Sequence, residues 1–122
     1  MFPTVATHLP AYTDESIALL KRLIATPSLS REEADTADLI EAFLRERGYA
    51  PRRRGHNVWL RAEATASDAP TLLLNSHHDT VRPALGWTYD PFTPTERNGR
   101  LYGLGSNDAG GPLVALLAAF RH

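Results

Sequence analysis

The pattern of apolar and polar positions predicts an amphipathic helix over residues 14–25. Four apolar side chains recur there at helical spacing: Ile17, Leu20, Leu23 and Ile24. Thr13 or Asp14 can cap the start of this helix. Pro27 should end it, because the residue before a proline is pushed out of the helical region of backbone conformation.

A second helix is predicted over residues 31–47. Its apolar stripe consists of Ala37, Ile40, Phe43 and Leu44. Ser30 and Glu33 have the spacing of a capping box, in which each side chain accepts a hydrogen bond from the other residue's backbone N–H. Gly48 is a suitable C-terminal stop, because glycine readily adopts the left-handed conformation that ends many helices.

The middle of the chain is expected to form strands. Residues 57–62 should form one strand, and residues 63–70, which are rich in Ala, Thr, Ser and Asp, a turn or hairpin loop. The continuous apolar run over residues 71–76 is typical of a strand buried on both faces, as in a parallel or mixed sheet covered by helices.

The C-terminal third alternates between irregular and regular structure. Three prolines and little periodicity predict a loop over residues 82–98. Residues 100–105 should form a short strand that leads into a glycine-rich turn, and residues 111–121 a helix that tolerates Pro112 in its first turn. The order helix, helix, strand, strand, strand, helix predicts an α/β fold with helices packed on a sheet.

Composition narrows the classes of function. The chain has 122 residues, 43% of them hydrophobic and 22% charged, which is ordinary for one globular domain. A net charge of −1 and a pI near 6.5 give no reason to expect nucleic acid or a membrane as a partner. The lack of cysteine excludes disulfides and cysteine-ligated metals. We expect a cytoplasmic protein, because residues 1–13 lack a signal-peptide pattern and the apolar stretch 112–120 is too short to span a bilayer.

The first candidate for chemistry is His77-His78-Asp79. It follows directly on the predicted buried strand, at the carboxyl end where open α/β sheets bind ligands. Because side chains alternate along a strand, His77 and Asp79 should share one face and His78 the other. His77 is then the natural metal ligand, and Asp79 can orient its imidazole. A capped strand end with surface histidines would look the same, so this pattern does not decide alone.

The second candidate is the glycine-rich turn over residues 103–111. Asp108 or Asn107 could simply cap the helix that follows. A phosphate-binding loop is set aside, because no Lys-Ser or Lys-Thr ending and no dinucleotide spacing is present. Taken together, however, a His at one strand end and an Asp after the next strand are what a nitrogen-and-oxygen metal site requires.

In their order along the chain, these residues resemble the signature of one family of zinc-dependent amidohydrolases. The similar residues are His77-His78-Asp79-Thr80-Val81, Trp87, Asp90-Pro91-Phe92, Gly99-Arg100-Leu101-Tyr102-Gly103-Leu104-Gly105 and Asp108. That family includes acetylornithine deacetylase, succinyl-diaminopimelate desuccinylase, aminoacylase and carboxypeptidase G. The resemblance implies that residues 1–122 are the N-terminal portion of a mixed-sheet, helix-covered catalytic domain of the dizinc exopeptidase type.

The resemblance also implies roles for three residues. His77 would bind one of two zinc ions, for which cobalt can substitute, and Asp108 would bridge both ions. Asp79 would support the imidazole of His77 and count as catalytic. The family commonly has a cis peptide bond after the bridging Asp, which would be Asp108–Ala109. The general-base Glu, the remaining metal ligands and the family's dimerisation domain would lie beyond position 122.

The implied reaction is hydrolysis of the N-acyl amide of a small N-acyl amino acid. Residues 75–79 and 106–111 look most like the acetylornithine deacetylase branch, which acts in arginine biosynthesis, although Ala109-Gly110 stands where the family usually has Met-Lys or similar. The alternatives are a dipeptidase or succinyl-diaminopimelate desuccinylase of the same family, or a non-catalytic binding or assembly module.

Two expectations concern the 122 residues on their own. Two motif residues cannot hold two zinc ions, so we expect an inactive chain without a tight zinc site. Strands without partners expose backbone edges, so we expect self-association as a homodimer or larger assembly. Trp87 and Tyr89 either line the substrate pocket or anchor their loop to the core.

Overall fold

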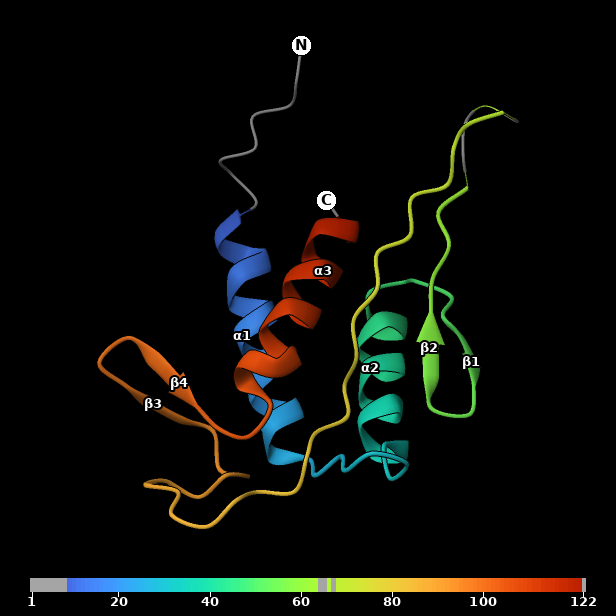
Figure 1. Cartoon of the computed structure of the whole chain (residues 1–122). Coiled ribbons are helices and arrows are strands. Elements are labelled where there is room, and N and C mark those ends of the chain that lie inside the picture. The colour runs from blue at the N-terminus through green and yellow to red at the C-terminus, as the bar shows by residue number, and fades with distance from the viewer. Residues whose placement is uncertain (1–8, 64–65, 67, 122) are drawn as a thin grey trace.

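Three α-helices and two short β-hairpins make up the part of the chain that the computed structural model describes, residues 9–63, 66 and 68–121 (Figure 1). A five-residue π-helical turn, Ser106–Gly110, precedes the last helix. The helices are α1 (Leu9–Ala25), α2 (Ala34–Glu46) and α3 (Gly111–Arg121). The strands are β1 (Arg52–Arg54), β2 (Asn57–Trp59), β3 (Thr95–Arg97) and β4 (Arg100–Tyr102).

Helix α1 begins five residues before the predicted start and ends at Ala25, as Pro27 predicts. Thr13 and Asp14 therefore lie inside the helix, and the prediction that one of them caps it is wrong. Pro10 is compatible with the first turn, where its missing N–H would have no helical partner.

Helix α2 begins three residues later than predicted, and the expected capping box is not formed. Glu33 stands at the N-cap without a side-chain cap, and its carboxylate accepts a hydrogen bond from the backbone N–H of Arg31 instead. Arg31 has a φ of 77°, which is incompatible with helix at that position. The hydroxyl of Ser30 bonds to Asp79 and is not available to the helix. Helix α2 ends at Glu46, one residue before the predicted end, and Gly48 follows as the predicted stop, with a φ of 82° and an N–H that donates to the carbonyl of Arg45.

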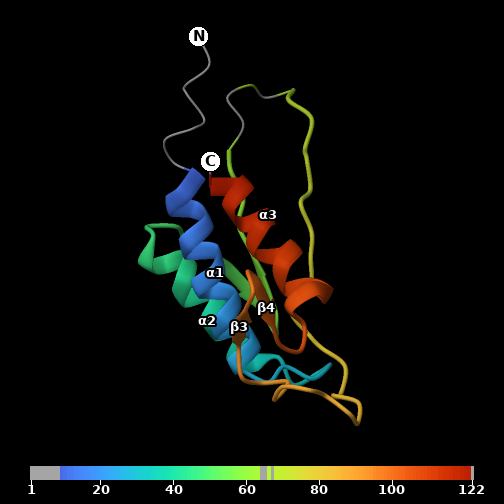
Figure 2. The same ribbon diagram turned by 90° about the vertical axis from the view of Figure 1, so that its left-hand side faces the viewer.

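The core lies among the three helices, and α1 and α3 run side by side in both views of the ribbon (Figures 1 and 2). The predicted apolar stripe of α2 is entirely buried. On α1, Leu19 is buried, whereas Ile17 of the predicted stripe is 38% exposed. The buried cluster consists of Leu19, Leu23, Ile40, Phe43, Leu44, Leu113 and Val114.

An ion cluster joins the ends of the three helices. Glu15 of α1 accepts hydrogen bonds from Arg121 of α3 at 2.7 Å and from Arg47, just after α2, at 3.2 Å. The guanidinium of Arg47 also lies 3.6 Å from the centre of the Phe43 ring, a cation–π geometry. Helix α3 is therefore fastened at its C-terminal end to both other helices.

Each hairpin has an antiparallel register closed by a two-residue turn. The turn of β3–β4 is Asn98-Gly99, with φ values of 52° and 72°. Two positive φ angles are typical of the tight turn that matches strand twist, and Asn-Gly is its preferred sequence. Strand β3 falls inside the predicted loop 82–98, and β1 was not predicted either. The prediction of a loop over the whole of residues 82–98 is therefore wrong at its C-terminal end.

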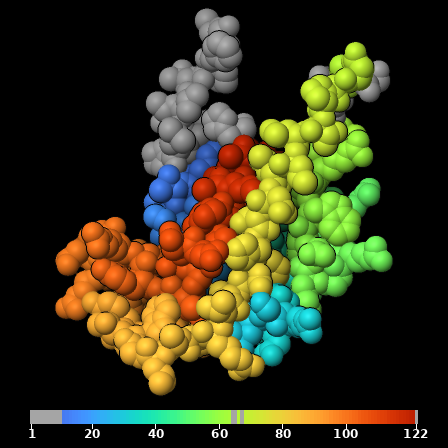
Figure 3. All heavy atoms as spheres, viewed as in Figure 1, coloured from blue at the N-terminus to red at the C-terminus, as the bar shows by residue number. Residues whose placement is uncertain are grey.

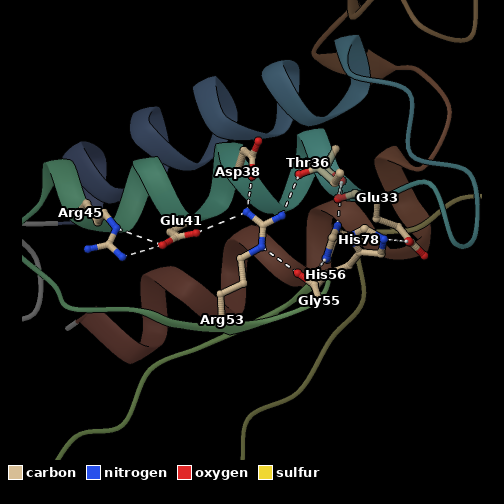
Figure 4. Close-up of polar contacts among 10 residues, drawn as sticks. Glu33, Thr36, Asp38, Glu41, Arg45, Arg53, Gly55, His56 and His78 are labelled. Atoms are coloured by element: carbon tan, nitrogen blue, oxygen red, sulfur yellow. Dashed lines mark hydrogen bonds and ion pairs between the residues drawn. The ribbon is translucent and has the colours of Figure 1, made fainter.

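The β1–β2 hairpin is fastened to α2 by charged groups (Figure 4). The guanidinium of Arg53 bonds to the carboxylates of Asp38 and Glu41 on α2 and to the carbonyl of Gly55 in its own turn. Arg45 shares the Glu41 carboxylate at 2.6 Å. The predicted strand over residues 57–62 is present as Asn57–Trp59 only.

The apolar run 71–76 differs most from expectation. It is extended but belongs to no strand, and Leu72 and Leu73 are 82% and 80% exposed. Figure 3 shows this yellow segment on the surface between the red helix α3 and the green hairpin. Among the described residues, the only backbone pairing near this segment is a parallel bridge between Leu29 and Thr80, which lies just beyond it. The prediction of a strand buried on both faces is therefore wrong for the described structure.

The fold class is confirmed in its coarser part, a mixture of helices and strands. The described strands form two separate two-stranded antiparallel sheets, so the expected mixed sheet covered by helices is not formed by the described residues. The physical reason is that the segment 71–76 finds no second strand beside it there. Residues 64, 65 and 67 of the predicted loop 63–70, and residues 1–8, lie outside the described part. None of the described helices has the length and apolar character needed to cross a membrane.

Candidate functional site

The side chains of His77 and Asp108 converge on one point. The Nε2 atom of His77 lies 3.0 Å from Oδ1 of Asp108, although 31 residues separate them in sequence. His77 directly follows the extended segment 71–76, and Asp108 stands in the π-helical turn before α3. Their side chains are 52% and 88% exposed, so the point between them is open to solvent. At this distance the two side chains form a hydrogen bond or ion pair, which places one nitrogen and one oxygen donor side by side.

Asp79 supports the other side of the same imidazole. Its Oδ1 lies 3.1 Å from Nδ1 of His77, and its backbone carbonyl oxygen lies 3.3 Å from that nitrogen. Both oxygens are acceptors, so Nδ1 carries a proton and donates it. The predicted alternation is confirmed in this respect, because His77 and Asp79 face the same side.

Carboxylates at both nitrogens favour the charged form of His77. Burial alone would lower the pKa of His77, but hydrogen bonds to the Asp79 backbone and to the Asp108 carboxylate outweigh it and raise the pKa above the ordinary value. The second proton of the imidazolium then points from Nε2 at Asp108. A metal ion bound between the two groups would take the place of that proton.

Ser30 completes this chain of contacts, and sequence reasoning had assigned it elsewhere. Its hydroxyl donates a hydrogen bond to Oδ2 of Asp79. This bond is the largest cause that holds the pKa of Asp79 below its usual value, burial opposes it, and the neighbouring His77 lowers the pKa further. Asp79 is therefore kept ionised as an acceptor for His77. A serine 49 residues away in sequence carries no local signal for this role.

The turn that presents Asp108 contains the expected cis peptide bond, Asp108–Ala109. The backbone of Asp108 is non-helical, with φ −125° and ψ 94°, and no side-chain cap is found in this turn. Its carboxylate contacts His77 rather than the start of α3, so the interpretation of Asp108 as a simple N-cap is not favoured. The N–H of Gly110 closes the turn by donating to the carbonyl of Gly105 at 2.8 Å.

His78 is engaged at both ring nitrogens by groups other than those around His77 (Figure 4). Its Nδ1 lies 2.8 Å from the hydroxyl of Thr36, which is fully buried, and its Nε2 donates to the carbonyl of His56 at 3.0 Å. His78 therefore fastens the segment to α2 and to the β1–β2 turn. It takes no part in the point between His77 and Asp108.

A hollow of about 340 Å³ opens beside that point. His77, Asp108 and Trp87 all line it, and Trp87 is 41% exposed there. Tyr89 has a different place, since its ring packs on Tyr102 with centroids 5.0 Å apart. Of the two aromatic residues that the sequence left undecided, Trp87 borders the hollow and Tyr89 anchors its loop to the β3–β4 hairpin.

The donor atoms fit part of a metal site. An imidazole nitrogen and a carboxylate oxygen are donors that zinc accepts, and the His77 ring is oriented by a carboxylate in the way metal-binding histidines usually are. Within the described ranges no group of three or more His, Cys, Asp or Glu residues is arranged to hold an ion. The described part of the chain thus brings together two donors and their support, fewer than the three or four protein ligands usual for zinc.

Comparison with known proteins bears on the same residues. The sequence profile of the Peptidase family M20/M25/M40 matches residues 73–122, which include His77, Asp79 and Asp108. Succinyl-diaminopimelate desuccinylases of several bacteria are similar to the chain. That of Delftia acidovorans is 33% identical over 116 residues, covering 87% of this chain and 30% of its own length. That of Nitrosococcus oceani is 34% identical over 113 residues, covering 88% and 29%.

These findings support a relationship of the chain to the M20 family of metallopeptidases and amidohydrolases. The chain spans about 30% of the length of the curated relatives it matches. The activity in their names is one of the alternatives raised by the sequence, rather than the deacetylation of N-acetylornithine.

Proposed function

We propose that these 122 residues are the N-terminal portion of the catalytic domain of an M20 hydrolase, which cleaves the N-acyl amide of a small amino-acid substrate with the help of bound metal. The observation that carries this proposal is the 3.0 Å approach of His77 to Asp108, with Asp79 on the far side of the imidazole. The match of the M20 profile to the same stretch supports it.

Each of the three residues has a role that follows from its contacts. Asp79 accepts a hydrogen bond from Nδ1 of His77, which would leave the Nε2 lone pair of the neutral ring free to hold a metal ion. Asp108 offers one oxygen on the His77 side, and its 88% exposure leaves the other oxygen open to a second ion. Zinc, or cobalt in its place, would polarise the acyl oxygen and make water a better nucleophile near neutral pH.

The remaining ligands and the general base are proposed to come from residues outside positions 1–122. Two protein donors are too few for a tight zinc site. The 122 residues alone should accordingly bind zinc weakly and hydrolyse nothing.

Two substrates are the leading candidates. N-succinyl-diaminopimelate is favoured by the names of the relatives, at 33–34% identity. N-acetylornithine is favoured by the residue pattern around positions 75–79 and 106–111 and would place the protein in arginine biosynthesis. Both are N-acyl amino acids with a free carboxylate, so the same chemistry serves either.

The first test is calorimetric titration of the chain with Zn²⁺. We expect binding weaker than micromolar that is lost in His77→Ala and in Asp108→Ala and retained in Asp35→Ala, which removes an exposed carboxylate on α2. A sub-micromolar site would contradict a partial site. Binding that survives the His77 and Asp108 substitutions would remove the basis of the proposal.

The second test is an activity screen of the full-length gene product on N-succinyl-diaminopimelate, N-acetylornithine and dipeptides, with and without a chelator. Hydrolysis of an N-acyl amino acid that stops on chelation and is restored by Zn²⁺ is the expected result. A product that binds these compounds and never cleaves them would favour a non-catalytic binding module instead.

A further inference from the structure

The connection between α1 and α2 lies along the segment that carries His77 and Asp79. The N–H of Thr80 donates to the carbonyl of Ser28 at 2.8 Å, and the Ser28 hydroxyl donates to the carbonyl of His78 at 2.8 Å. Ser28 is only 3% exposed, and the neighbouring Leu29 forms the parallel bridge with Thr80. The backbone on the C-terminal side of His77 is therefore fixed by this connection.

Two residues farther along, the same connection contacts a side chain of the site. The hydroxyl of Ser30 donates to Oδ2 of Asp79, while Oδ1 of that carboxylate accepts from Nδ1 of His77. Nε2 of His77 in turn faces Asp108. These contacts form one continuous row from Ser30 to Asp108.

The Ser30 hydroxyl is not needed by the helix that follows it. Helix α2 begins without a side-chain cap, and Ser30 itself is exposed. The fold therefore gives this hydroxyl no described task other than its bond to Asp79.

We propose that Ser30 is a positioning residue of the metal site, which sets the rotation of the Asp79 carboxylate and thereby keeps the His77 proton on Nδ1. This inference rests on the proposed function for its purpose. The physical argument is that a carboxylate bound at only one oxygen turns about its terminal torsion, which is broad and soft. With Oδ2 held by Ser30, Oδ1 stays aimed at Nδ1, and the lone pair of the neutral ring stays at Nε2.

The position of the segment and the rotation of the carboxylate are held by different residues. The backbone is fixed by the bond from the Ser28 hydroxyl to the carbonyl of His78 and by the contact of the His78 ring with Thr36, which Figure 4 shows. Ser30 acts on the carboxylate alone. Ser28→Ala is therefore a matched control for Ser30→Ala, since each removes one hydroxyl from the same connection.

The test is nuclear magnetic resonance of the metal-free chain with ¹⁵N-labelled histidine, at alkaline pH where the imidazoles are neutral. In the unaltered chain and in Ser30→Thr, which keeps the hydroxyl, His77 should be protonated at Nδ1. In Ser30→Ala the Nε2-protonated tautomer should appear, while the urea unfolding midpoint stays unchanged. Ser28→Ala should lower the midpoint and leave the tautomer as it is.

Three results would overturn the inference. The first is an unchanged tautomer in Ser30→Ala. The second is an equal tautomer change in Ser28→Ala, because the effect would then come from the backbone. The third is unfolding of Ser30→Ala under conditions in which Ser28→Ala stays folded, because Ser30 would then serve the fold.

Titration with Co²⁺, followed by its visible absorption, separates this inference from the proposed function. Ser30→Ala should weaken Co²⁺ binding by about 10- to 100-fold, the usual effect of losing a group that supports a ligand, and Ser30→Thr should restore it. If the full-length gene product hydrolyses no N-acyl amino acid while the tautomer of the 122-residue chain changes as expected in Ser30→Ala, the proposed function fails and the role of Ser30 stands. If the chain binds Co²⁺ equally well with and without the hydroxyl, the role of Ser30 fails alone.

Discussion

Gly105 opens the turn that carries Asp108, and its replacement by alanine tests how closely that turn packs on the His77–Thr80 segment. Gly105 has a φ of 74°, and a Cβ built there would lie 2.6 Å from the methyl carbon of Thr80. A left-handed residue with a Cβ costs about 1–2 kcal/mol, and forcing an extra methyl into packed atoms costs about 1–3 kcal/mol. Since the Thr80 side chain can rotate to relieve part of the clash, we expect Gly105→Ala to lower the free energy of unfolding by about 2–4 kcal/mol.

Gly99 is the matched control for the backbone part of this cost. Its φ of 72° is nearly the same, but a Cβ there would meet nothing within 4 Å. Gly99→Ala should therefore cost only the conformational share, about 1 kcal/mol. In the double variant Gly105→Ala/Thr80→Ser the methyl of Thr80 is absent, so its loss should fall toward that of Gly99→Ala.

The assay is urea unfolding followed by far-ultraviolet circular dichroism, with the slope of the transition checked for two-state behaviour. Losses that are equal for Gly105→Ala and Gly99→Ala would refute the reasoning, because the turn would then not be packed against Thr80. A double variant that recovers nothing would place the cost elsewhere than in the methyl contact.

Three further predictions follow from the same structure. Hydrogen bonds from Arg121 and Arg47 hold the pKa of Glu15 below its usual value of 4.5, so its contribution to stability is present above that value and lost as pH falls through the folded-state pKa. Glu15→Gln, at a side chain 38% exposed, should cost about 0.5–1 kcal/mol in urea unfolding at neutral pH and nothing in strong acid, and a pH-independent cost would contradict this. Thr36→Val should cost about 1–3 kcal/mol in the same assay, because it leaves Nδ1 of the half-buried His78 without its partner, and a cost near zero would argue against that bond. The chain should self-associate in light scattering and Leu73→Lys should weaken this, because Leu73 is 80% exposed on an unpaired extended segment, whereas a monomeric unaltered chain would count against both.

The helices were predictable from sequence because their signals are local. Apolar spacing, Pro27 and Gly48 mark α1 and α2 within a few residues. The start of α2 was not predictable, since Ser30 has the form of a cap and finds its partner in Asp79, 49 positions away. A hydroxyl that can either accept from a helix N–H or donate to a carboxylate is assigned only by the fold.

The strands were predicted less well because pairing is not local. The Asn98-Gly99 pair is a strong hairpin signal, and attention to it would have found β3 and β4 together. Apolar character alone placed a buried strand at residues 71–76, where the described structure supplies no neighbouring strand. Hydrophobicity predicts that a segment is buried in the folded protein, but it does not predict which other segment buries it.

The sequence predicted which residues form the candidate site, but only part of how they are arranged. Alternation along the chain correctly separated His77 and Asp79 from His78, and the resemblance named Asp108 and the cis peptide bond after it. The distance between His77 and Asp108 could not follow from sequence, because it depends on how the turn after β4 meets the end of the extended segment. Ser30 was found only from coordinates.

His77 lies between a part of the chain with many backbone contacts and a part with exposed side chains and no backbone pairing among the described residues. On its C-terminal side, Thr80 is bonded to Ser28 and the segment follows the α1–α2 connection. On its N-terminal side, Leu72 and Leu73 are exposed. An ion held by His77 and Asp108 would link this segment to the turn before α3, and by mass action it would stabilise whichever arrangement brings the two residues together. Burial of the apolar run by other residues would hold the same segment in place at its N-terminal end. Metal binding and burial of residues 71–76 should therefore strengthen each other.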